Sequence, residues 1–455
     1  MKDKFFFINT IGCQMNVYDS ENMASCLISL GYKKIDSVDS ADIVIVNTCS
    51  IREKAEQKAF SFLGRLAKLK QNKKNLIIGV GGCVAQQEGE KIIERMPFVD
   101  FVLGTQAIGH LEDIIIKLES DKKIIVDIEK CEEIEMHQGS FEGSKNNISS
   151  FVTIMRGCEN FCAYCVVPYV RGKEISRKPE NILNEIKEKV KIGVREITLL
   201  GQNVNSYGKK ESLCSFSELL YRINEIEGLF RIRFTTSHPK DLSMELIESF
   251  KKLDKLCGHI HLPVQSGSDN ILKRMNRKYT KAAYLDKINM LRKIRPNIAI
   301  TSDFIVGFPG ETKKDFEETI DLIKTVEFDG IFAFVYSDRP NTPSSSFSDK
   351  VPIEEQKNRL SELLETQEFF TKKKNQSILE HTELVLVEGF SKKTIAEASQ
   401  NNDKQWTGRT SSNKIVHFIE DEKFKDKISI GNLIEVKIEK AFSHSLWGKA
   451  CILYK

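Results

Sequence analysis

The sequence predicts an α/β protein built from two parallel β-sheets and a small C-terminal β-barrel. Short Val- and Ile-rich runs alternate with amphipathic helical stretches through most of the chain, which is typical of parallel strands covered by helices on both faces. From about residue 382 the apolar period shortens to two residues, as in strands with one buried face. At 455 residues the chain is long enough for more than one packed core.

Composition excludes few classes of protein, but charge is unevenly distributed. Charged residues make up 29% and hydrophobic residues 40%, which is ordinary for a globular protein. The net charge of +4 is too small to predict nucleic-acid binding. Residues 52–75 nevertheless contain eight Lys or Arg against two acids, and residues 271–295 contain nine against one. Either run alone fits a solvated helix face, whereas the two together favour a polyanionic partner.

Cysteine usage indicates a reducing compartment. The eleven cysteines are an odd number scattered over a long chain, unlike the disulfide framework of a small secreted domain. The apolar run near the N-terminus is only four residues long, which is too short for a signal peptide. No stretch is apolar for long enough to cross a membrane. We therefore expect a cytoplasmic protein without a membrane anchor.

The first third of the chain predicts an open parallel sheet whose first three strands are each followed by a cysteine. The expected strands are 5–8, 42–47, 76–80 and 99–103, and the expected helices are 20–30, 52–70, 86–96 and 108–118. Cys13, Cys49 and Cys83 follow the first three strands, so they should meet at the carboxyl edge, where open α/β sheets bind ligands. Buried structural thiols are the simpler interpretation of one such cysteine. Three at the same topological position favour a metal site.

Glycines precede the third of these cysteines. The Gly79–Gly82 run lacks the spacing and the lysine of a Walker phosphate loop. We expect these glycines to let the backbone approach a cluster held by the cysteines.

The middle of the chain predicts a partial (βα)6 barrel of the TIM type. Its expected strands are 151–155, 196–201, 231–236, 259–264, 298–307 and 330–336. The first expected helix, 180–190, follows Pro179 in a favoured first-turn position. Active sites of such barrels lie at the carboxyl ends of the strands. The polar residues Gln202, Asn203, Gln265 and Ser266 follow the second and fourth strands and should line that rim.

Three cysteines follow the first barrel strand at C-x3-C-x2-C spacing. Thiolates are the usual protein ligands of iron–sulfur clusters, and Cys158, Cys162 and Cys165 supply three of the four that a four-iron cluster needs. Either a distant cysteine completes the set, or one iron is open to an exogenous ligand. His259 and His261 alternate on the fourth strand and could both point into the barrel as metal ligands, but no carboxylate-rich set accompanies them. We favour the thiolates.

The last third predicts a long helix over 353–379 and then a small antiparallel β-barrel. Residues 433–441 alternate apolar and charged side chains, as a half-buried strand does. Small β-barrels often bind oligonucleotides, and Trp406 and Trp447 are suited to base stacking. Core packing is about as good an explanation of either tryptophan.

These motifs resemble a known family. Cys158, Cys162 and Cys165, with Tyr164 before the last, match the motif of radical S-adenosylmethionine (radical SAM) enzymes. The segments 12–16 (Gly-Cys-Gln-Met-Asn), 47–53 and 82–86 are similar to the methylthiotransferase branch, and the final module resembles a TRAM RNA-binding domain. The 12–16 and 336–343 segments are closest to tRNA 2-methylthio-N6-isopentenyladenosine synthases, apart from Asn341, where we expect glycine.

The resemblance implies the cofactors and the sites that hold them. It implies two [4Fe-4S] clusters, one on Cys158, Cys162 and Cys165 that binds S-adenosylmethionine, and an auxiliary one on Cys13, Cys49 and Cys83 that carries sulfur. The expected S-adenosylmethionine contacts are Tyr164, Gln202, Asn203, Gln265 and Ser266. We expect a methylthiotransferase domain over 1–120, a linker over 121–149, a radical SAM domain over 150–380 and a TRAM domain over 381–455.

The implied reaction is methylthiolation of a tRNA. One S-adenosylmethionine would donate a methyl group to the sulfur, and a second would be cleaved to a 5′-deoxyadenosyl radical that opens C2 of N6-isopentenyladenosine at position 37, since that C–H bond resists acid–base chemistry. The implied partners are the tRNA anticodon arm and an electron donor such as flavodoxin or ferredoxin, with the enzyme a monomer. Lys273, Arg274, Arg277 and Lys278 are candidate RNA contacts.

Two alternatives stay open. The same chemistry acts on threonylcarbamoyladenosine of tRNA or on an aspartate of a ribosomal protein in related branches, and the 12–16 segment argues against both by resemblance. A non-catalytic iron–sulfur protein that binds RNA or transfers electrons is the alternative from another class. Two three-cysteine sets without an obvious fourth ligand argue against it.

Overall fold

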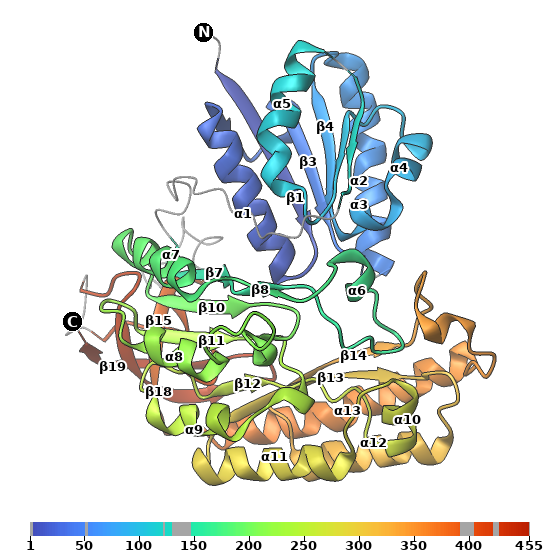
Figure 1. Cartoon of the computed structure of the whole chain (residues 1–455). Helices are drawn as coiled ribbons and strands as arrows, with labels where there is room; N and C mark the ends of the chain where they lie inside the picture. Colours follow the sequence, from blue (N-terminus) through green and yellow to red (C-terminus); the bar gives the residue numbers. More distant parts are fainter. Residues whose placement is uncertain are drawn as a thin grey trace.

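The computed structural model describes residues 3–50, 53–121, 123–129, 147–391, 405–421 and 427–454. Its N-terminal part is a parallel sheet in the order β2-β1-β3-β4-β5-β6, with helices on both faces (Figure 1). The strands are β1 (Lys4–Ile11), β2 (Tyr32–Lys34), β3 (Ile43–Thr48), β4 (Ile77–Gly82), β5 (Phe101–Leu103) and β6 (Ile125–Asp127). The helices are α1 (Gln14–Ser29), α2 (Glu53–Asn72), α3 (Cys83–Glu88), α4 (Glu90–Arg95) and α5 (Leu111–Ser120).

The faces of this sheet are buried in two separate apolar cores. One core joins α1 and α5 to the sheet through Met23, Ile45 and Leu111, and the other joins α2, α3 and α4 through Val44 and Leu63. Each such side chain contributes about 1.5–3 kcal/mol when it is fully buried. The predicted parallel sheet is therefore confirmed. Both of its faces are buried, which explains why its strands are continuous apolar runs.

Three sequence expectations for this part need correction. The helix expected over 86–96 is two helices, because Gly89 has φ +51° and interrupts it. The strands β2 and β6 were not expected, since three residues are too few to show a period. Because β6 pairs with β5, the sheet continues to Asp127, past the expected boundary at residue 120. Residues 130–146, most of the expected linker, lie outside the described residues.

The middle of the chain forms the predicted open barrel. Its two parallel sheets, β11-β10-β7 and β12-β13-β14, are connected by a bridge from Ile232 to Leu256. The barrel strands are β7 (Ser149–Thr153), β10 (Glu196–Leu200), β11 (Arg231–Phe234), β12 (His259–His261), β13 (Ala299–Val306) and β14 (Gly330–Val335). The outer helices are α7 (Pro179–Lys191), α8 (Phe216–Asn224), α9 (Met244–Lys252), α10 (Asp269–Arg274), α11 (Lys281–Ile294) and α12 (Lys313–Val326). Their apolar faces form one large core with the strands.

The C-terminal part begins with the helix α13 (Ile353–Gln376), which packs on β14 through Leu363 and Phe370. It is followed by a closed barrel in the order β15-β16-β17-β19-β18. The strands are β15 (Thr382–Phe390), β16 (Gln405–Thr410), β17 (Ile415–Ile419), β18 (Leu433–Ala441) and β19 (Leu446–Tyr454). The pairing is antiparallel except between β17 and β19, which are parallel.

The C-terminal barrel is held against the middle barrel by two arginines of β11. Arg231 donates to the carbonyls of Arg409 at 2.6 Å and Leu384 at 2.8 Å. Arg233 donates to the carbonyls of Ser411 at 3.0 Å and Thr410 at 2.7 Å. Both side chains are buried. The turn between β16 and β17 is thereby docked at the amino ends of the barrel strands.

The N-terminal sheet lies over the opposite end of the barrel (Figure 1). On α1, Met15 and Tyr18 pack with Leu200 at the end of β10. Thr105, after β5, donates to the carbonyl of Val170 in α6 (Val167–Val170) at 2.7 Å. The carboxyl edges of both sheets consequently face each other.

Candidate cluster sites

The three N-terminal cysteines meet at the carboxyl edge of the first sheet. Cys13 caps the start of α1, Cys49 follows β3, and Cys83 is the first residue of α3. The Cys49 thiol is hydrogen-bonded to both Cys13 and Cys83. Cys49 and Cys83 are buried, whereas Cys13 is exposed. The structure therefore brings together residues that lie far apart in the sequence, as their position after parallel strands predicts.

Two buried asparagines connect the loops that carry these thiols. Asn16 accepts from the Cys13 amide at 3.2 Å and donates to Asn47 at 3.1 Å. Asn47 donates to the Asn16 carbonyl and to Ser20, each at 2.8 Å. Both amides are fully buried, so each depends on the other for its hydrogen bonds. This network explains why Asn accompanies cysteine in both segments.

Gly82 sets the position of the third thiol. Its φ is +92°, and a Cβ there would lie 2.3 Å from the Asn47 side chain and 2.6 Å from the Thr48 carbonyl oxygen. Only glycine fits this backbone and this approach. At Gly82 the close approach is to protein groups of the neighbouring loop, and the approach to a cluster stays a prediction.

A buried arginine from the middle part of the chain lies beside these three thiols. Arg171 donates to Asp19 of α1 at 2.7 Å, and both side chains are less than a tenth exposed. The hydrogen bond from Cys49 lowers the pKa of Cys13 to about 6 and that of Cys83 to about 7, against the effect of burial, and the Arg171 charge lowers both pKa values further. Burial alone lowers the pKa of Arg171, but Asp19 and the two thiols raise it, so the guanidinium stays charged.

The second set of cysteines lies in the segment that connects β8 (Met155–Arg156) to its antiparallel partner β9 (Ile175–Ser176). Gly157 begins the loop with φ +76°, and a Cβ there would lie 1.8 Å from the Lys173 carbonyl oxygen. Cys158, Cys162 and Cys165 are close enough to affect one another electrostatically. Burial raises the pKa of Cys158, and burial followed by the Cys162 charge raises that of Cys165 to about 12.

Arg277 lies against this loop and is not on the surface. It donates to the Cys162 sulfur and the Tyr164 hydroxyl, each at 3.4 Å, and to the Pro263 carbonyl at 2.6 Å. Its side chain is only 4% exposed. The prediction that Arg277 contacts RNA is therefore wrong. Although Arg277 belongs to the basic run, it is buried, and its partners are a thiol, a hydroxyl and a carbonyl group of the interior. Lys273 and Lys278 are exposed, and Arg274 pairs with Asp349.

The expected S-adenosylmethionine residues lie at the carboxyl ends of the barrel strands, but several already bind protein groups. Gln202 accepts from the Gly157 amide at 2.5 Å and so anchors the cysteine loop. Asn203 donates to Asp241 at 2.8 Å and accepts from the His238 amide at 3.2 Å. Gln202 and Asn203 thus hold neighbouring loops of the rim in place through hydrogen bonds.

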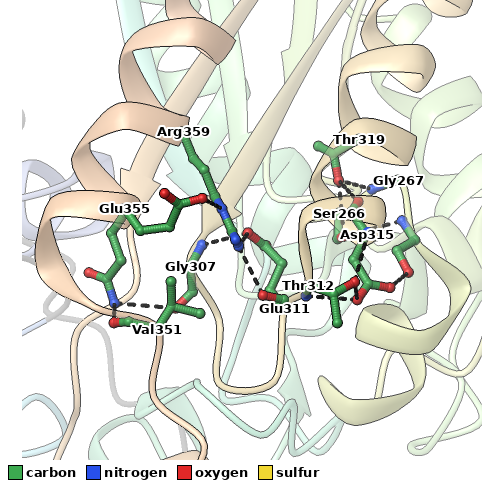
Figure 2. Close-up of polar contacts among 12 residues, drawn as sticks. Ser266, Gly267, Gly307, Glu311, Thr312, Asp315, Thr319, Val351, Glu355 and Arg359 are labelled. Carbon is green, nitrogen blue, oxygen red and sulfur yellow. Dashed lines mark hydrogen bonds and ion pairs between the residues drawn. The ribbon is translucent and has the colours of Figure 1, made fainter.

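The fourth and fifth strand ends are tied together in the same way (Figure 2). Ser266 lies 3.3 Å from the Thr319 hydroxyl and is buried. Glu311 accepts from the Gly307 amide at 2.9 Å and from Arg359 of α13 at 2.6 Å. Gln265 differs, since it has φ +77° although it is not glycine. Strain of that kind is stored where surrounding structure over-determines a functional loop.

The histidines of β12 bind protein groups. His259 and His261 each lie 3.0 Å from the Thr301 hydroxyl, and His261 lies 3.3 Å from Asp303. Among the described residues, no set of three or more His, Cys, Asp or Glu side chains surrounds a point suited to a single metal ion. A four-iron cluster has a different requirement, because each thiolate binds a different iron. Three thiols beside a buried arginine fit such a cluster at both sites, with Cys13 the one exposed thiol of the six.

The departure at Asn341 has a simple physical reason. Asn341 has φ +64°, the left-handed region that favours glycine. Asn is one of the few other residues that adopt this region at low cost. The turn after β14 therefore keeps its shape.

Comparison with known proteins agrees with this geometry. Residues 152–323 match the Radical SAM superfamily, and residues 5–104 match Uncharacterized protein family UPF0004. The structure of the radical S-adenosylmethionine methyltransferase TsrM from Kitasatospora setae has a similar fold, with a TM-score of 0.55 over 76% of this chain and 77% of that chain at 11% identity. Fold, cysteine loop and superfamily match together define a radical SAM enzyme.

Relatives that match over nearly the full length of the chain show which family of radical SAM enzymes it belongs to. The tRNA-2-methylthio-N(6)-dimethylallyladenosine synthase of Desulfosudis oleivorans is 51% identical over 98% of this chain and 97% of its own length. The proteins of that name from Geobacter sulfurreducens and Clostridium botulinum are 46% and 48% identical over 98% of this chain, and over 98% and 96% of their own lengths. The chain belongs to the family of tRNA-2-methylthio-N(6)-dimethylallyladenosine synthases.

Proposed function

We propose that this protein is a tRNA-modifying enzyme that adds a methylthio group to C2 of N6-isopentenyladenosine at position 37, beside the anticodon. It uses two molecules of S-adenosylmethionine and a sulfur from an auxiliary cluster. The observation that carries the proposal is the pair of three-thiol sites on facing edges of two sheets. One site alone fits an electron carrier or a simpler radical enzyme, whereas insertion of sulfur needs a radical source and a sulfur source at one substrate.

The residues of each site have assigned roles. Cys158, Cys162 and Cys165 would hold one cluster, which would supply the electron for cleavage of S-adenosylmethionine, and Cys13, Cys49 and Cys83 would hold a second, which would supply sulfur. When bound, the clusters supply the reducing electron and the sulfur atom. Arg277 and Arg171 offset the negative charge of thiolates in the two sites, where burial would otherwise favour protonation. Tyr164, Gln202, Asn203, Gln265 and Ser266 position S-adenosylmethionine, directly or by shaping the rim.

The target base must leave the anticodon loop to reach the space between the two edges. Unstacking one base of a single-stranded loop costs little compared with extrusion from a duplex. The C-terminal barrel binds the anticodon arm in this proposal. Trp447 is the better candidate for RNA contact, since it is half-buried with Lys440 5.2 Å from its ring centroid. Trp406 is only 5% exposed and stacks on Phe390, so it belongs to the core.

Cellular context completes the proposal. We place the enzyme in the cytoplasm as a monomer, reduced by a donor such as flavodoxin or ferredoxin.

The domains are 1–120 with the short strand β6 added, 150–380 and 381–455. Within the described residues, no helix is both long and apolar enough to cross a bilayer.

Two measurements test the function. Anaerobic reconstitution of the full chain should give about eight irons and eight sulfides per chain, as two four-iron clusters require. About four would remove the auxiliary cluster and with it the proposal. Nucleoside mass spectrometry of tRNA from a deletion strain should show loss of the methylthio group with the isopentenyl group retained. Loss from threonylcarbamoyladenosine instead would favour the alternative branch.

A further inference from the structure

A groove lies on the outer side of the N-terminal sheet, close to the auxiliary thiols. Its volume is about 560 Å³, and it is lined by Asn9 and Ile11 of β1 and by Gln57, Lys58, Ser61, Phe62 and Arg65 of α2. It is open because β2 pairs only with Lys4–Phe6 of β1. Beyond that point β1 has a neighbouring strand on one side only, and its last residues are left beside α2 without further cover.

The groove continues to the auxiliary site. The Ile11 carbonyl, at one end of the groove, accepts from the Cys49 amide at 3.0 Å, and Cys13 follows two residues later. Its other wall, α2, begins four residues after Cys49. Since a helix rises about 1.5 Å per residue, Lys58 lies roughly 8 Å from the first residue of α2, and Arg65 lies about 10 Å further on. A ligand in the groove would therefore lead directly to the auxiliary thiols.

The lining has the chemistry of a single-stranded RNA site. Lys58, Ser61, Phe62 and Arg65 are spaced i, i+3, i+4 and i+7, so they share one face of α2. Lys58 and Arg65 are exposed, and among the described residues neither has an ion-pair partner. The Arg65 guanidinium lies 5.0 Å from the centre of the Phe62 ring, which holds it over the groove. Cations that follow the backbone beside an aromatic face are typical of proteins that bind single strands.

Two cations of the basic run belong to this groove. Lys58 and Arg65 line it, whereas Lys68 is exposed elsewhere on α2 and Lys70 lies at the far end of the helix, where it pairs with Asp100. Arg222 on α8 differs from Lys58 and Arg65, since it pairs with Glu218 at i−4.

We propose that this groove binds the phosphates of anticodon-loop nucleotides flanking the target adenosine, through Lys58 and Arg65. Asn9 and Ser61 provide a hydrogen-bonding floor for the base or ribose edges. This inference rests on the proposed function, since it assigns to the substrate RNA a second contact area, separate from the C-terminal barrel. The stem is bound by that barrel, and the loop is bound next to the site that supplies sulfur.

Binding of an isopentenylated anticodon stem-loop to the full-length reconstituted enzyme tests the inference, measured by fluorescence anisotropy over a range of salt concentrations. Lys58→Gln and Arg65→Gln should each weaken binding and reduce the slope of log affinity against log salt by about 0.7, the value for one lost contact with a single strand. Lys58→Arg and Arg65→Lys should keep the wild-type slope, because the charge is retained.

Lys117→Gln is the matched control, since Lys117 is exposed on α5, on the opposite face of the same sheet. It should leave both affinity and slope unchanged, and all variants should cleave S-adenosylmethionine without RNA at the wild-type rate. Unchanged slopes in Lys58→Gln and Arg65→Gln, or an equal change in Lys117→Gln, would overturn the groove as an RNA site. Failure of the wild-type enzyme to bind the stem-loop at all would instead overturn the proposed function.

Discussion

The two cysteine sites are built in opposite ways. Cys158, Cys162 and Cys165 come from one eight-residue loop, whose shape is set locally by Gly157 and by its bond to Gln202. Cys13, Cys49 and Cys83 come from three strand ends that meet only when the first sheet is complete. The first site therefore depends mainly on its own loop, whereas the second depends on a whole domain and on its seat against the barrel.

The surroundings of the thiols differ as well. The auxiliary thiols share hydrogen bonds with one another and lie near Arg171, which comes from the other domain. The loop thiols are dominated by burial, with Arg277 on the Cys162 sulfur as the main cationic partner. The auxiliary site is consequently the one whose electrostatics depend on the domain interface.

The largest expected effect separates the two sites by their chemistry. Cys162→Ala should abolish both formation of 5′-deoxyadenosine and methylthio transfer, because the radical source is lost. Cys13→Ala should abolish transfer but leave 5′-deoxyadenosine formation measurable. Liquid chromatography of both products from anaerobic assays checks this. Unchanged transfer in Cys13→Ala would mean that the auxiliary site has no part in the reaction.

The next effect tests the dependence on the domain interface. Asp19→Asn should cost about 3–5 kcal/mol, since it leaves the buried Arg171 without its carboxylate. The N-terminal domain should unfold at a lower temperature and retain less iron, while the loop cluster stays intact. Thermal unfolding and iron content of the reconstituted protein report the two outcomes. Asp121→Asn, an exposed substitution, is the control. Equal loss of iron from both sites would contradict the separation.

A smaller effect concerns the polar network behind the auxiliary thiols. Asn47→Ala removes the amide that bonds to Asn16 and Ser20, at a cost of about 1–3 kcal/mol for each buried group left unpaired. The auxiliary cluster should be lost more readily on exposure to a chelator, whereas 5′-deoxyadenosine formation should be close to wild type. A variant that keeps about eight irons under the chelator would show that the network is not needed.

The smallest expected effect concerns the hydrogen bond that anchors the Cys158–Cys165 loop. Gln202→Ala removes the acceptor for the Gly157 amide, a single hydrogen bond worth about 1 kcal/mol. Because Cys158 follows Gly157 directly, S-adenosylmethionine cleavage should slow while the auxiliary cluster keeps its iron. Gln202→Glu retains an acceptor oxygen and should restore the rate in part. Loss of auxiliary iron in Gln202→Ala would show that the two sites are coupled through the rim.

The meeting of Cys13, Cys49 and Cys83 could be predicted from the sequence, because a thiol after each of three parallel strands has one plausible meeting place. Cys158, Cys162 and Cys165 could be recognised by their spacing, although the short strands β8 and β9 around them could not. The polar residues around the six cysteines could not be predicted. Arg277 lies in a basic run, so the sequence predicts that it is on the surface. Arg171 and Asp19 are far apart in the sequence, and no spacing predicts their contact.

Residues at strand ends were harder to assign than the cysteines. Asn203 and Ser266 do follow strands, but their side chains are engaged by Asp241, by the His238 amide and by Thr319. Only the folded arrangement distinguishes a residue that touches a ligand from one that holds the loop. Short strands such as β2 and β6 escaped prediction because their pairing, and not their own sequence, defines them.

The joint between the two barrels has a consequence for how freely the chain can vary. Arg231 and Arg233 bind main-chain carbonyls of the C-terminal barrel, which every amino acid possesses. Two side chains of the turn also take part, since the Ser411 hydroxyl accepts from the Gly258 amide at 2.8 Å and Lys414 pairs with Asp329 at 3.4 Å. The four bonds to carbonyls do not depend on which residues supply them, so surface positions of the C-terminal barrel other than Ser411 and Lys414 can change without loss of these contacts.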